Sequence, residues 1–185
     1  MLLRSSALLV LAVLALALAL ALASISCSDP ALDMAVERLG PERDGETPGP
    51  LHRAGQPCLV CHSARGPASN APFAVAGTVF EKPSPDSPLA KAMEIHLRDA
   101  LNHSPGIFTT NAVGNFYITE KEWPDLTYPL RVGIKRDGKE KAMRTTVNRE
   151  GSCNFCHRPA TNSRFSLPTD EPRTSIGQVD FEGAQ

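Results

Sequence analysis

The chain has 185 residues, with 19 basic and 20 acidic side chains and a formal net charge of −1 at pH 7. A charge this close to neutral argues against binding to nucleic acid or to an anionic membrane surface, since both favour a strongly basic protein. Sixteen prolines and a single tryptophan indicate a loop-rich chain rather than a helical bundle.

The first 26 residues have the pattern of an export signal. Arg4 precedes an almost unbroken Leu/Ala/Val run from Ala7 to Ile25, and small residues close the segment. This pattern is typical of a secretory signal peptide, although the run is also near the length of a retained membrane anchor. Removing residues 1–26 takes away Arg4 and no acid, which leaves 18 basic and 20 acidic residues. The remainder is long enough for one core of moderate size.

Cys27 is the fifth cysteine of the chain and lies outside two close cysteine pairs. A leftover thiol in an exported protein calls for an explanation. The residues "SISC" at 24–27 resemble a bacterial lipobox, in which the cysteine becomes the lipidated first residue of the mature chain, although Ser24 stands where Leu is usual. Cleavage after "ALA" at 21–23 is the alternative. We expect lipidation of Cys27 and a membrane attachment through it.

Residues 27–57 are predicted to be a linker with one short helix. In "DPALDMAVERLG", Asp29 is a suitable N-cap, Pro30 takes the first helical position, and Gly40 follows the end. The next stretch, "PERDGETPGPLHRAGQP", is rich in proline, glycine and charge, which indicates a loop.

Residues 73–148 contain short runs in which apolar and polar positions alternate, as in β-strands. The runs are "FAVAGTVF", "MEIHLRDA", "IFTT", "NAVGNFYIT" and "YPLRVGIK". Turn residues separate them, and Asp137-Gly138 predicts a tight hairpin into "KEKAMRTTV". About six short strands of this kind predict a mainly β fold, a small β-sandwich. Residues 169–185 lack periodicity and are predicted to be a flexible tail.

Three of these stretches carry a resemblance to a known family. "VAGTVF", "TTNAVGNFYI" and "YPLRVGI" resemble the prealbumin-like sandwiches of the carboxypeptidase regulatory-like class, with G-x-V on an early strand, then Thr, a turn, Gly-x-Phe and a hydrophobic strand. The resemblance covers residues 73–148. It implies a small prealbumin-like sandwich that is a rigid frame without chemistry of its own.

One five-residue pattern occurs on both sides of the predicted sandwich, as "CLVCH" at 58–62 and "CNFCH" at 153–157. In c-type attachment both cysteine sulfurs form thioethers to haem vinyl groups, and the adjacent histidine coordinates the iron. We therefore expect two covalent haems c, in loop-rich segments 58–72 and 149–168. The expected attachment residues are Cys58, Cys61, Cys153 and Cys156, and the expected proximal iron ligands are His62 and His157.

Other uses of the two Cys-x-x-Cys pairs stay open. The four thiols could hold one zinc ion, but zinc requires no histidine after either pair, and histidine is only 5 of 185 residues. Zinc ribbons also suit the cytosol better than an oxidising compartment. Disulfide exchange needs a βαβ setting that the segment lacks. Two ordinary structural disulfides are the remaining alternative.

Because of the two motifs and the export signal, the chain resembles bacterial exported c-type cytochromes. It is similar to cytochrome-like lipoproteins in which a sandwich lies between two attachment motifs. The resemblance implies covalent haem, electron transfer with redox partner proteins, and a membrane-attached location in the bacterial periplasm or at the cell surface. It does not extend to the helical cytochrome c domain, because the segment between the motifs is predicted to be β.

The sequence offers four candidates for the second axial ligand of each iron. His96 lies opposite the apolar face of its strand and His103 lies in the turn "NHSPG", so we rank these two first. His52 lies in the loop before the first motif, and Met143 is expected to pack in the core.

The predicted function is electron transfer without enzymatic activity. One alternative is a dihaem redox enzyme of the peroxidase or reductase kind, which needs an open iron position. Another is a non-haem surface binding protein stabilised by zinc or disulfides.

Overall fold

The computed structural model describes residues 13–15, 29–46, 48–82, 84, 87–158 and 179–182. The chain divides into two compact units, Met1–Met34 and Ala35–Gln185. Cys27 and all of the predicted export signal except residues 13–15 lie outside the described residues. Within the described part of the chain, no helix is both long and apolar enough to cross a bilayer.

Helix α2 spans Pro30–Leu39, as the sequence predicted. The Asp29 carboxylate accepts a hydrogen bond from the backbone N–H of Leu32, at 3.3 Å, which caps the first turn. Gly40 follows the last helical residue with a φ of +66°, a conformation that glycine adopts at little cost at helix ends.

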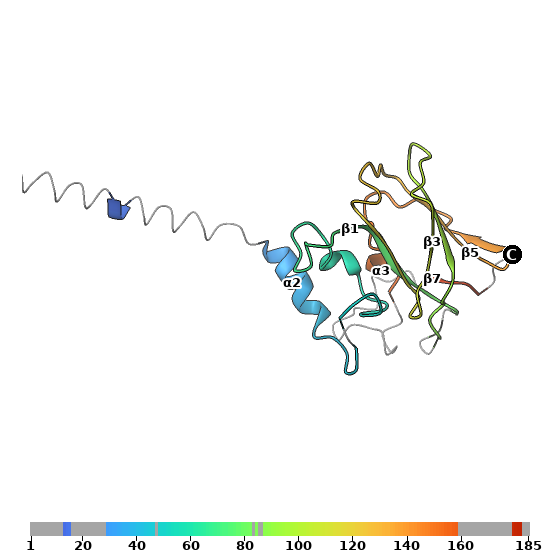
Figure 1. Ribbon diagram of the computed structural model, residues 1–185, viewed down its shortest axis with the longest axis horizontal. Helices are drawn as coiled ribbons and strands as arrows, with labels where there is room; N and C mark the ends of the chain where they lie inside the picture. The colour runs from blue at the N-terminus through green and yellow to red at the C-terminus, as the bar shows by residue number, and fades with distance from the viewer. Residues whose placement is uncertain are drawn as a thin grey trace, which may run out of the picture. The chain divides into compact units, whose positions relative to one another are not determined.

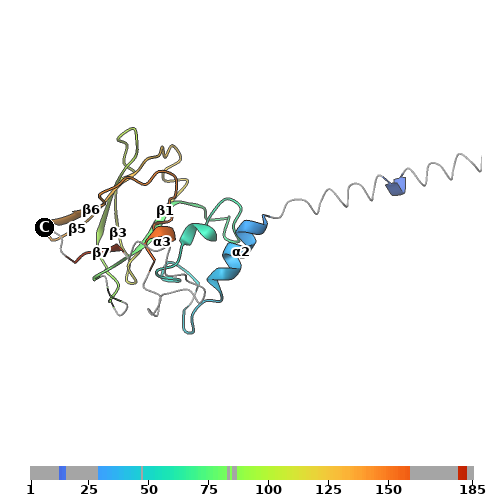
Figure 2. The ribbon, with the colours of Figure 1, turned by 180° about the vertical axis from the view of Figure 1, so that it is seen from behind.

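The second unit is mainly β and forms a small β-sandwich (Figures 1 and 2), which confirms the predicted fold class. One sheet has three strands in the order β4-β1-β7, and the other has four in the order β3-β2-β5-β6. The strands are β1 (Phe73–Phe80), β2 (Glu94–Arg98), β3 (Ile107–Thr109), β4 (Asn115–Thr119), β5 (Arg131–Arg136), β6 (Lys139–Ala142) and β7 (Val179–Asp180).

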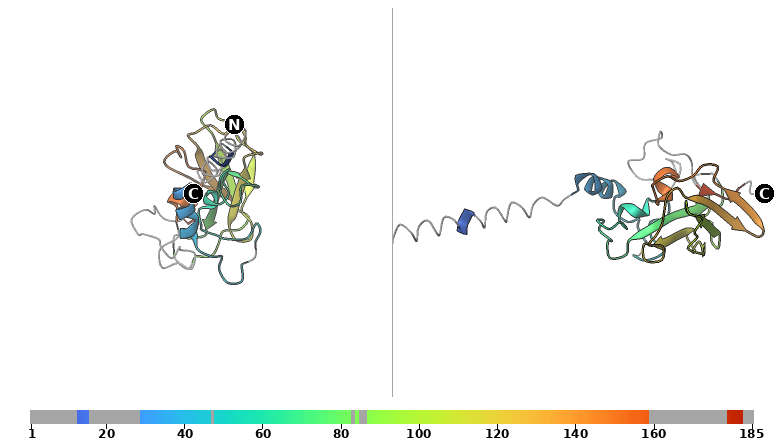
Figure 3. Two further views of the ribbon diagram at one scale, coloured as in Figure 1. Left: turned by 90° about the vertical axis from the view of Figure 1, so that its left-hand side faces the viewer. Right: turned by 90° about the horizontal axis from the view of Figure 1, so that it is seen from above.

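The hydrophobic core lies between the two sheets. Figure 3 shows the ribbon of these sheets from two further directions. The period-two pattern of β2 decides which of its residues enter the core: Ile95 and Leu97 are buried, whereas the alternate residues are partly or fully exposed. Across the ladder, Ile95 pairs with Ile134 of β5. The core residues are Val75, Val79, Ala90, Met93, Ile95, Leu97, Phe116, Ile118, Trp123, Leu130 and Ile134.

The predicted hairpin at Asp137-Gly138 joins β5 to β6. Both turn residues have positive φ angles, +52° and +79°, as a two-residue turn between antiparallel strands requires. The sequence signal at this hairpin was therefore sufficient, because the turn depends only on adjacent residues.

Strand β7 is a difference from the sequence prediction, which assigned residues 169–185 to a flexible tail. Val179 and Asp180 pair in parallel with Val79 and Phe80 of β1. Two residues cannot show a period-two pattern, and their pairing partner lies far away in the sequence, so local periodicity could not reveal this strand.

Strand β1 contacts both cysteine motifs. At its start, the Phe73 N–H donates to the carbonyl of His62 at 2.8 Å, and farther along, the Ala76 N–H donates to the carbonyl of Gly151 at 2.9 Å. Ser152, just before the second motif, forms a parallel bridge with Ala76. The sandwich therefore supplies one strand as the common support of two segments that lie 90 residues apart in the chain.

Candidate haem-attachment sites

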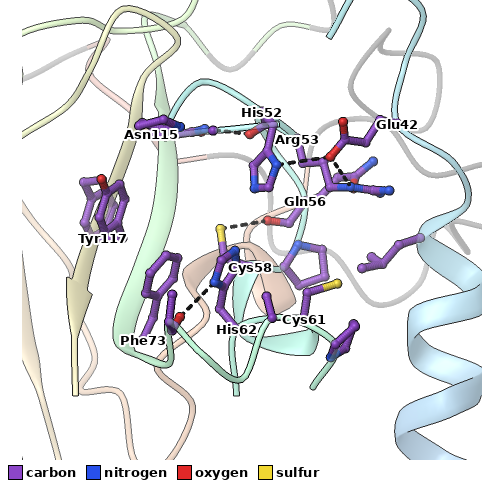
Figure 4. A pocket seen from close by; sticks show the side chains of 18 of the residues that line it. Glu42, His52, Arg53, Gln56, Cys58, Cys61, His62, Phe73, Asn115 and Tyr117 are labelled. Atoms are coloured by element: carbon purple, nitrogen blue, oxygen red, sulfur yellow. Dashed lines mark hydrogen bonds and ion pairs between the residues drawn. The ribbon is translucent and has the colours of Figure 1, made fainter. Parts of the chain in front are cut away.

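The first motif folds as a tight turn. Cys58–Val60 form the 3-10 helix η2, and the His62 N–H donates to the Cys58 carbonyl at 2.9 Å. This turn brings Cys58, Cys61 and His62 to the lining of one cavity of about 500 Å³ (Figure 4). The surface of the cavity is mostly apolar, and its apolar side chains are those of Leu39, Pro50, Pro57, Pro67, Ala68, Ala71, Phe73 and Phe116. A mostly apolar cavity with a few polar groups suits a cofactor.

The imidazole of His62 is held in one orientation. Its Nδ1 lies 2.9 Å from the carbonyl oxygen of Ala71, and because a carbonyl only accepts, this nitrogen carries the proton. The unprotonated Nε2 is then available as a metal ligand. Phe73 stacks flat on the imidazole, with ring centres 4.0 Å apart, and Tyr117 stacks on Phe73 at 4.7 Å. The backbone carbonyl and the ring stack together fix the predicted proximal ligand.

A second histidine lines the same cavity. His52 has its ring centre 5.9 Å from that of His62, at an interplanar angle of 61°, and Figure 4 shows its side chain pointing into the cavity. The Nδ1 of His52 lies 3.1 Å from Oε1 of Glu42. From the sequence we ranked His52 below His96 and His103, because its loop has no periodicity that predicts the direction of a side chain.

The second motif begins in a different local structure. Cys153–Cys156 form a single helical turn, α3, and the His157 N–H donates to the Cys153 carbonyl at 2.9 Å. The buried side chain of Asn154 donates to the His157 carbonyl at 3.0 Å, which holds the end of the turn. Cys153, Cys156 and His157 line a second cavity, of about 670 Å³, and Met143 lines it as well.

Burial raises the pKa of three of the four motif thiols. It raises the pKa of Cys58 to about 12 and that of Cys153 to about 12. For Cys61 burial also raises the pKa, against the opposing effect of the Arg53 charge. These three groups are therefore neutral thiols at neutral pH, whereas thiols that act in disulfide exchange have lowered pKa values.

The two motifs lie side by side against β1. A Cβ added at Gly77 of β1 would lie 2.8 Å from Cβ of Cys153, and one added at Gly151 would lie 3.1 Å from Cδ2 of Leu59. Leu59 is inside the first motif, and Gly151 directly precedes the second. Besides burial, the negative charge of an ionised Cys58 would raise the pKa of Cys153. This effect requires the two thiols to lie near each other. The structure thus brings together two sites that the sequence showed only as separate.

The remaining candidate axial ligands lie in different places. His96 is on β2 with Nε2 3.0 Å from Oε2 of Glu94, and it lines neither of the two cavities. The side chain of His103 is 64% exposed beside Asp99 and also lines neither cavity. Met143 follows the end of β6 and is half-buried at the second cavity; it is not part of the core between the sheets, where we had expected it.

The part of the chain that the structure describes contains no group of three or more His, Cys, Asp or Glu side chains that could hold a metal ion by themselves. Comparison with known proteins finds no family, no curated protein and no solved structure that matches the chain.

Proposed function

We propose that the protein is an exported, membrane-anchored c-type cytochrome that carries two covalent haems and transfers electrons. One observation carries the proposal: each Cys-x-x-Cys-His motif directs both cysteines and its histidine to the lining of its own cavity. The two volumes, about 500 and 670 Å³, fall within the range of ~300–1,000 Å³ that is usual for cofactor pockets.

The residues of the first cavity fit a haem. Cys58 and Cys61 present two thiols on one turn for thioether bonds, and His62 offers Nε2 because Ala71 holds the proton on Nδ1. The surrounding surface is mostly apolar, which excludes water from a bound macrocycle and tunes its potential. When bound, haem supplies an iron centre that is reversibly oxidised and reduced by one electron.

Two alternative uses of the cysteines have less support. A single zinc ion bound by all four thiols would need them at one point, whereas the two pairs line separate cavities, each beside its own histidine. Disulfide exchange needs a thiol that ionises readily, and burial raises the pKa values of Cys58, Cys61 and Cys153.

The placement of the motifs supports electron transfer between two haems and a redox partner. Both motif segments bond to β1 through backbone hydrogen bonds, and Leu59 of one faces Gly151 of the other. A rigid strand that holds two attachment segments next to each other would keep two redox centres at a constant separation. A lipid on Cys27 would confine them to a membrane surface in the bacterial periplasm or at the cell surface.

Covalent haem is tested by production of the full chain in bacteria with a c-type maturation system. A denaturing gel stained for haem peroxidase activity should show colour on the polypeptide, and an alkaline pyridine spectrum should give two haems per chain. The matched variants C58A/C61A and C153A/C156A should each lose half of the haem. Wild-type protein without colour on the denaturing gel would contradict the proposal.

The membrane anchor is tested separately by Cys27→Ala, with Ser28→Ala as the neighbouring control. The Cys27 variant should move from the membrane fraction to the soluble fraction and keep its haem content, whereas the Ser28 variant should stay at the membrane. Wild-type protein that incorporates no labelled fatty acid, in a comparison with the Cys27 variant, would show that the anchor is not a lipid on this residue.

A further inference from the structure

We propose that His52 is the second axial ligand of the haem held by the first motif and that Glu42 positions its imidazole. This inference rests on the proposed covalent haem and goes beyond it, because the Cys-x-x-Cys-His pattern assigns only the proximal ligand. Four observations carry it: the distance between two imidazoles, the carboxylate beside Nδ1 of His52, the attachment of its loop, and the location of the competing histidines.

The distance between the two imidazoles suits a shared metal ion. Two imidazoles on opposite sides of one metal, each with a nitrogen about 2 Å from it, have ring centres roughly 6 Å apart. The ring centres of His52 and His62 are 5.9 Å apart, and both rings line the first cavity. An imidazole can rotate about its own bond to the metal without changing that bond. The interplanar angle of 61° is therefore compatible with ligation of one metal by both rings.

The hydrogen-bond partner of His52 also suits ligation. Glu42 places a carboxylate oxygen 3.1 Å from Nδ1 of His52, and the carboxylate accepts the Nδ1 proton, which leaves Nε2 free. Metal-ligating histidines usually donate their second ring N–H to a carboxylate or a backbone carbonyl. In the first cavity, His52 has a carboxylate partner and His62 has a carbonyl partner, so both imidazoles meet this condition.

Glu42 is itself held in place. Its Oε1 lies 3.5 Å from Nε of Arg53. The same guanidinium donates through Nη1 to Gln56 at 2.8 Å and through Nη2 to the Gly40 carbonyl at 3.0 Å. Figure 4 shows Glu42 between His52 and Arg53 at the edge of the cavity. The carboxylate therefore has a defined position from which to orient the imidazole.

The loop that carries His52 is attached to the sandwich. The amide of Asn115 donates to the His52 carbonyl at 2.9 Å, and the amide of Asn111 donates to the Pro50 carbonyl at 2.6 Å. Farther along, the Gly55 N–H donates to the hydroxyl of Thr78 at 2.8 Å. Thr78 and Asn115 are buried, and the Thr78 hydroxyl donates a hydrogen bond to Oδ1 of Asn115 at 2.7 Å. The position of His52 is thus set by β1 and β4, which makes it a defined ligand position.

The competing histidines lie elsewhere. His96 and His103 line neither of the two cavities, and His96 is bonded to Glu94 on the outer face of β2. They differ from His52 in location and not in chemistry. They are therefore matched controls for its substitution.

The experiment isolates the first haem in the full chain. The C153A/C156A variant removes the second haem and keeps the Cβ of Cys153, which packs against Gly77. In this background the ferric and ferrous spectra should be those of a six-coordinate low-spin haem that binds little CO. His52→Ala should abolish the low-spin spectrum, give binding of about one CO per haem, and recover the low-spin spectrum on addition of imidazole. His96→Ala and His103→Ala should change neither the spectra nor CO binding.

Two further variants separate ligation from a structural role. His52→Met should keep six coordination and raise the midpoint potential, because methionine ligation favours the ferrous state. Glu42→Gln should keep the low-spin spectrum and shift the potential upward, because a neutral partner makes the imidazole less basic. Glu42→Asp should restore part of the original potential, a response that a merely structural residue would not give.

The outcomes are distinguishable. Wild-type chain without covalent haem overturns the proposed function and this inference with it. Covalent haem whose low-spin spectrum survives His52→Ala overturns this inference alone. Should the variant fold poorly, the near-infrared magnetic circular dichroism of the C153A/C156A protein decides the question, since bis-histidine and histidine–methionine ligation give different charge-transfer bands. A bis-histidine band that is unchanged in H96A, H103A and H157A supports His52, and any other ligation overturns it.

Discussion

The two Cys-x-x-Cys-His motifs have the same spacing and different surroundings. The first is a 3-10 turn, and its cavity contains a second histidine whose loop is bonded to the sandwich. The second is a single α-helical turn between β6 and β7, and Met143 lines its cavity. In the proposed cytochrome, the motif would determine where a haem is attached, and the fold around it would determine which side chain lies on the other side of the iron.

The difference has a physical origin in the way each segment meets β1. The segment before the first motif packs over the sandwich, with Ala54 and Phe80 buried together. The segment before the second motif runs beside β1 and pairs with it at Ala76. One segment thus adds a loop that closes over its cavity, and the other leaves its cavity bordered by β5, β6 and β7.

The largest expected effects come from two glycines next to the motifs, which permit close backbone contacts. A Cβ at Gly66 would collide with the Cys61 carbonyl, and one at Gly151 would collide with the Ala74 carbonyl. Each of G66A and G151A should lower the free energy of unfolding by up to about 3 kcal/mol, as overpacking does. Thermal unfolding and haem stoichiometry should show that G66A loses haem at the first motif and keeps it at the second. G151A should lose more haem at the second motif than at the first, whose Leu59 the new Cβ would also contact. Equal loss at both motifs in G66A would contradict this expectation.

The next effect concerns the attachment of the His52 loop. Asn115→Ala removes the hydrogen bond to the His52 carbonyl and leaves the buried hydroxyl of Thr78 without its acceptor. The cost should be about 2 kcal/mol, because an unsatisfied buried group is expensive. The spectrum of the first haem should gain a high-spin fraction, and that of the second should stay unchanged. A high-spin fraction that appears only in the spectrum of the second haem would contradict the assignment of the His52 loop to the first cavity.

A redox titration should separate the two haems. Besides His157, Met143 is the described residue of the second cavity whose side chain is a usual haem ligand, so the second haem should have the higher potential. Met143→Leu should lower that potential or open the iron to CO and should cost less than ~1.5 kcal/mol of stability, because the volume is conserved. An unchanged titration of both haems would exclude Met143 as a ligand.

The smallest effect lies away from both motifs. Arg136 of β5 donates two hydrogen bonds to Glu81, which follows β1, at 2.7 and 2.6 Å. These hydrogen bonds lower the pKa of Glu81. The pair therefore stabilises the fold above the unfolded-state pKa of glutamate, and this contribution is lost as the pH falls through the lowered folded-state value. Glu81→Gln should cost at most about 1 kcal/mol at pH 7.

The difference in stability between Glu81→Gln and the wild type should shrink in acid, which denaturant unfolding at several pH values would measure. Neither haem spectrum should change, because the pair is not part of either cavity lining. A difference that stays constant down to acid pH would contradict the assigned role of the ion pair.

Much of the fold was predictable from local sequence. The alternation of "MEIHLRDA" predicted the buried face of β2, and Asp137-Gly138 predicted the β5–β6 hairpin. The repeat of Cys-x-x-Cys-His predicted two separate attachment segments, because the reach between two cysteines depends only on the residues between them. Each of these features depends on neighbours in the chain, so a single sequence contains the necessary information.

The tertiary structure decided the rest. His52 reaches the cavity because Asn115 and Asn111, which follow it by 63 and 59 residues in the chain, bond to its loop, and β7 forms because residues a hundred positions earlier offer an edge. Such contacts depend on the packing of the whole sandwich, and they produce no periodic pattern in the sequence of the segments that they join. The sequence alone therefore determined the two Cys-x-x-Cys-His motifs and their β frame, and the fold determined which side chain faces His62.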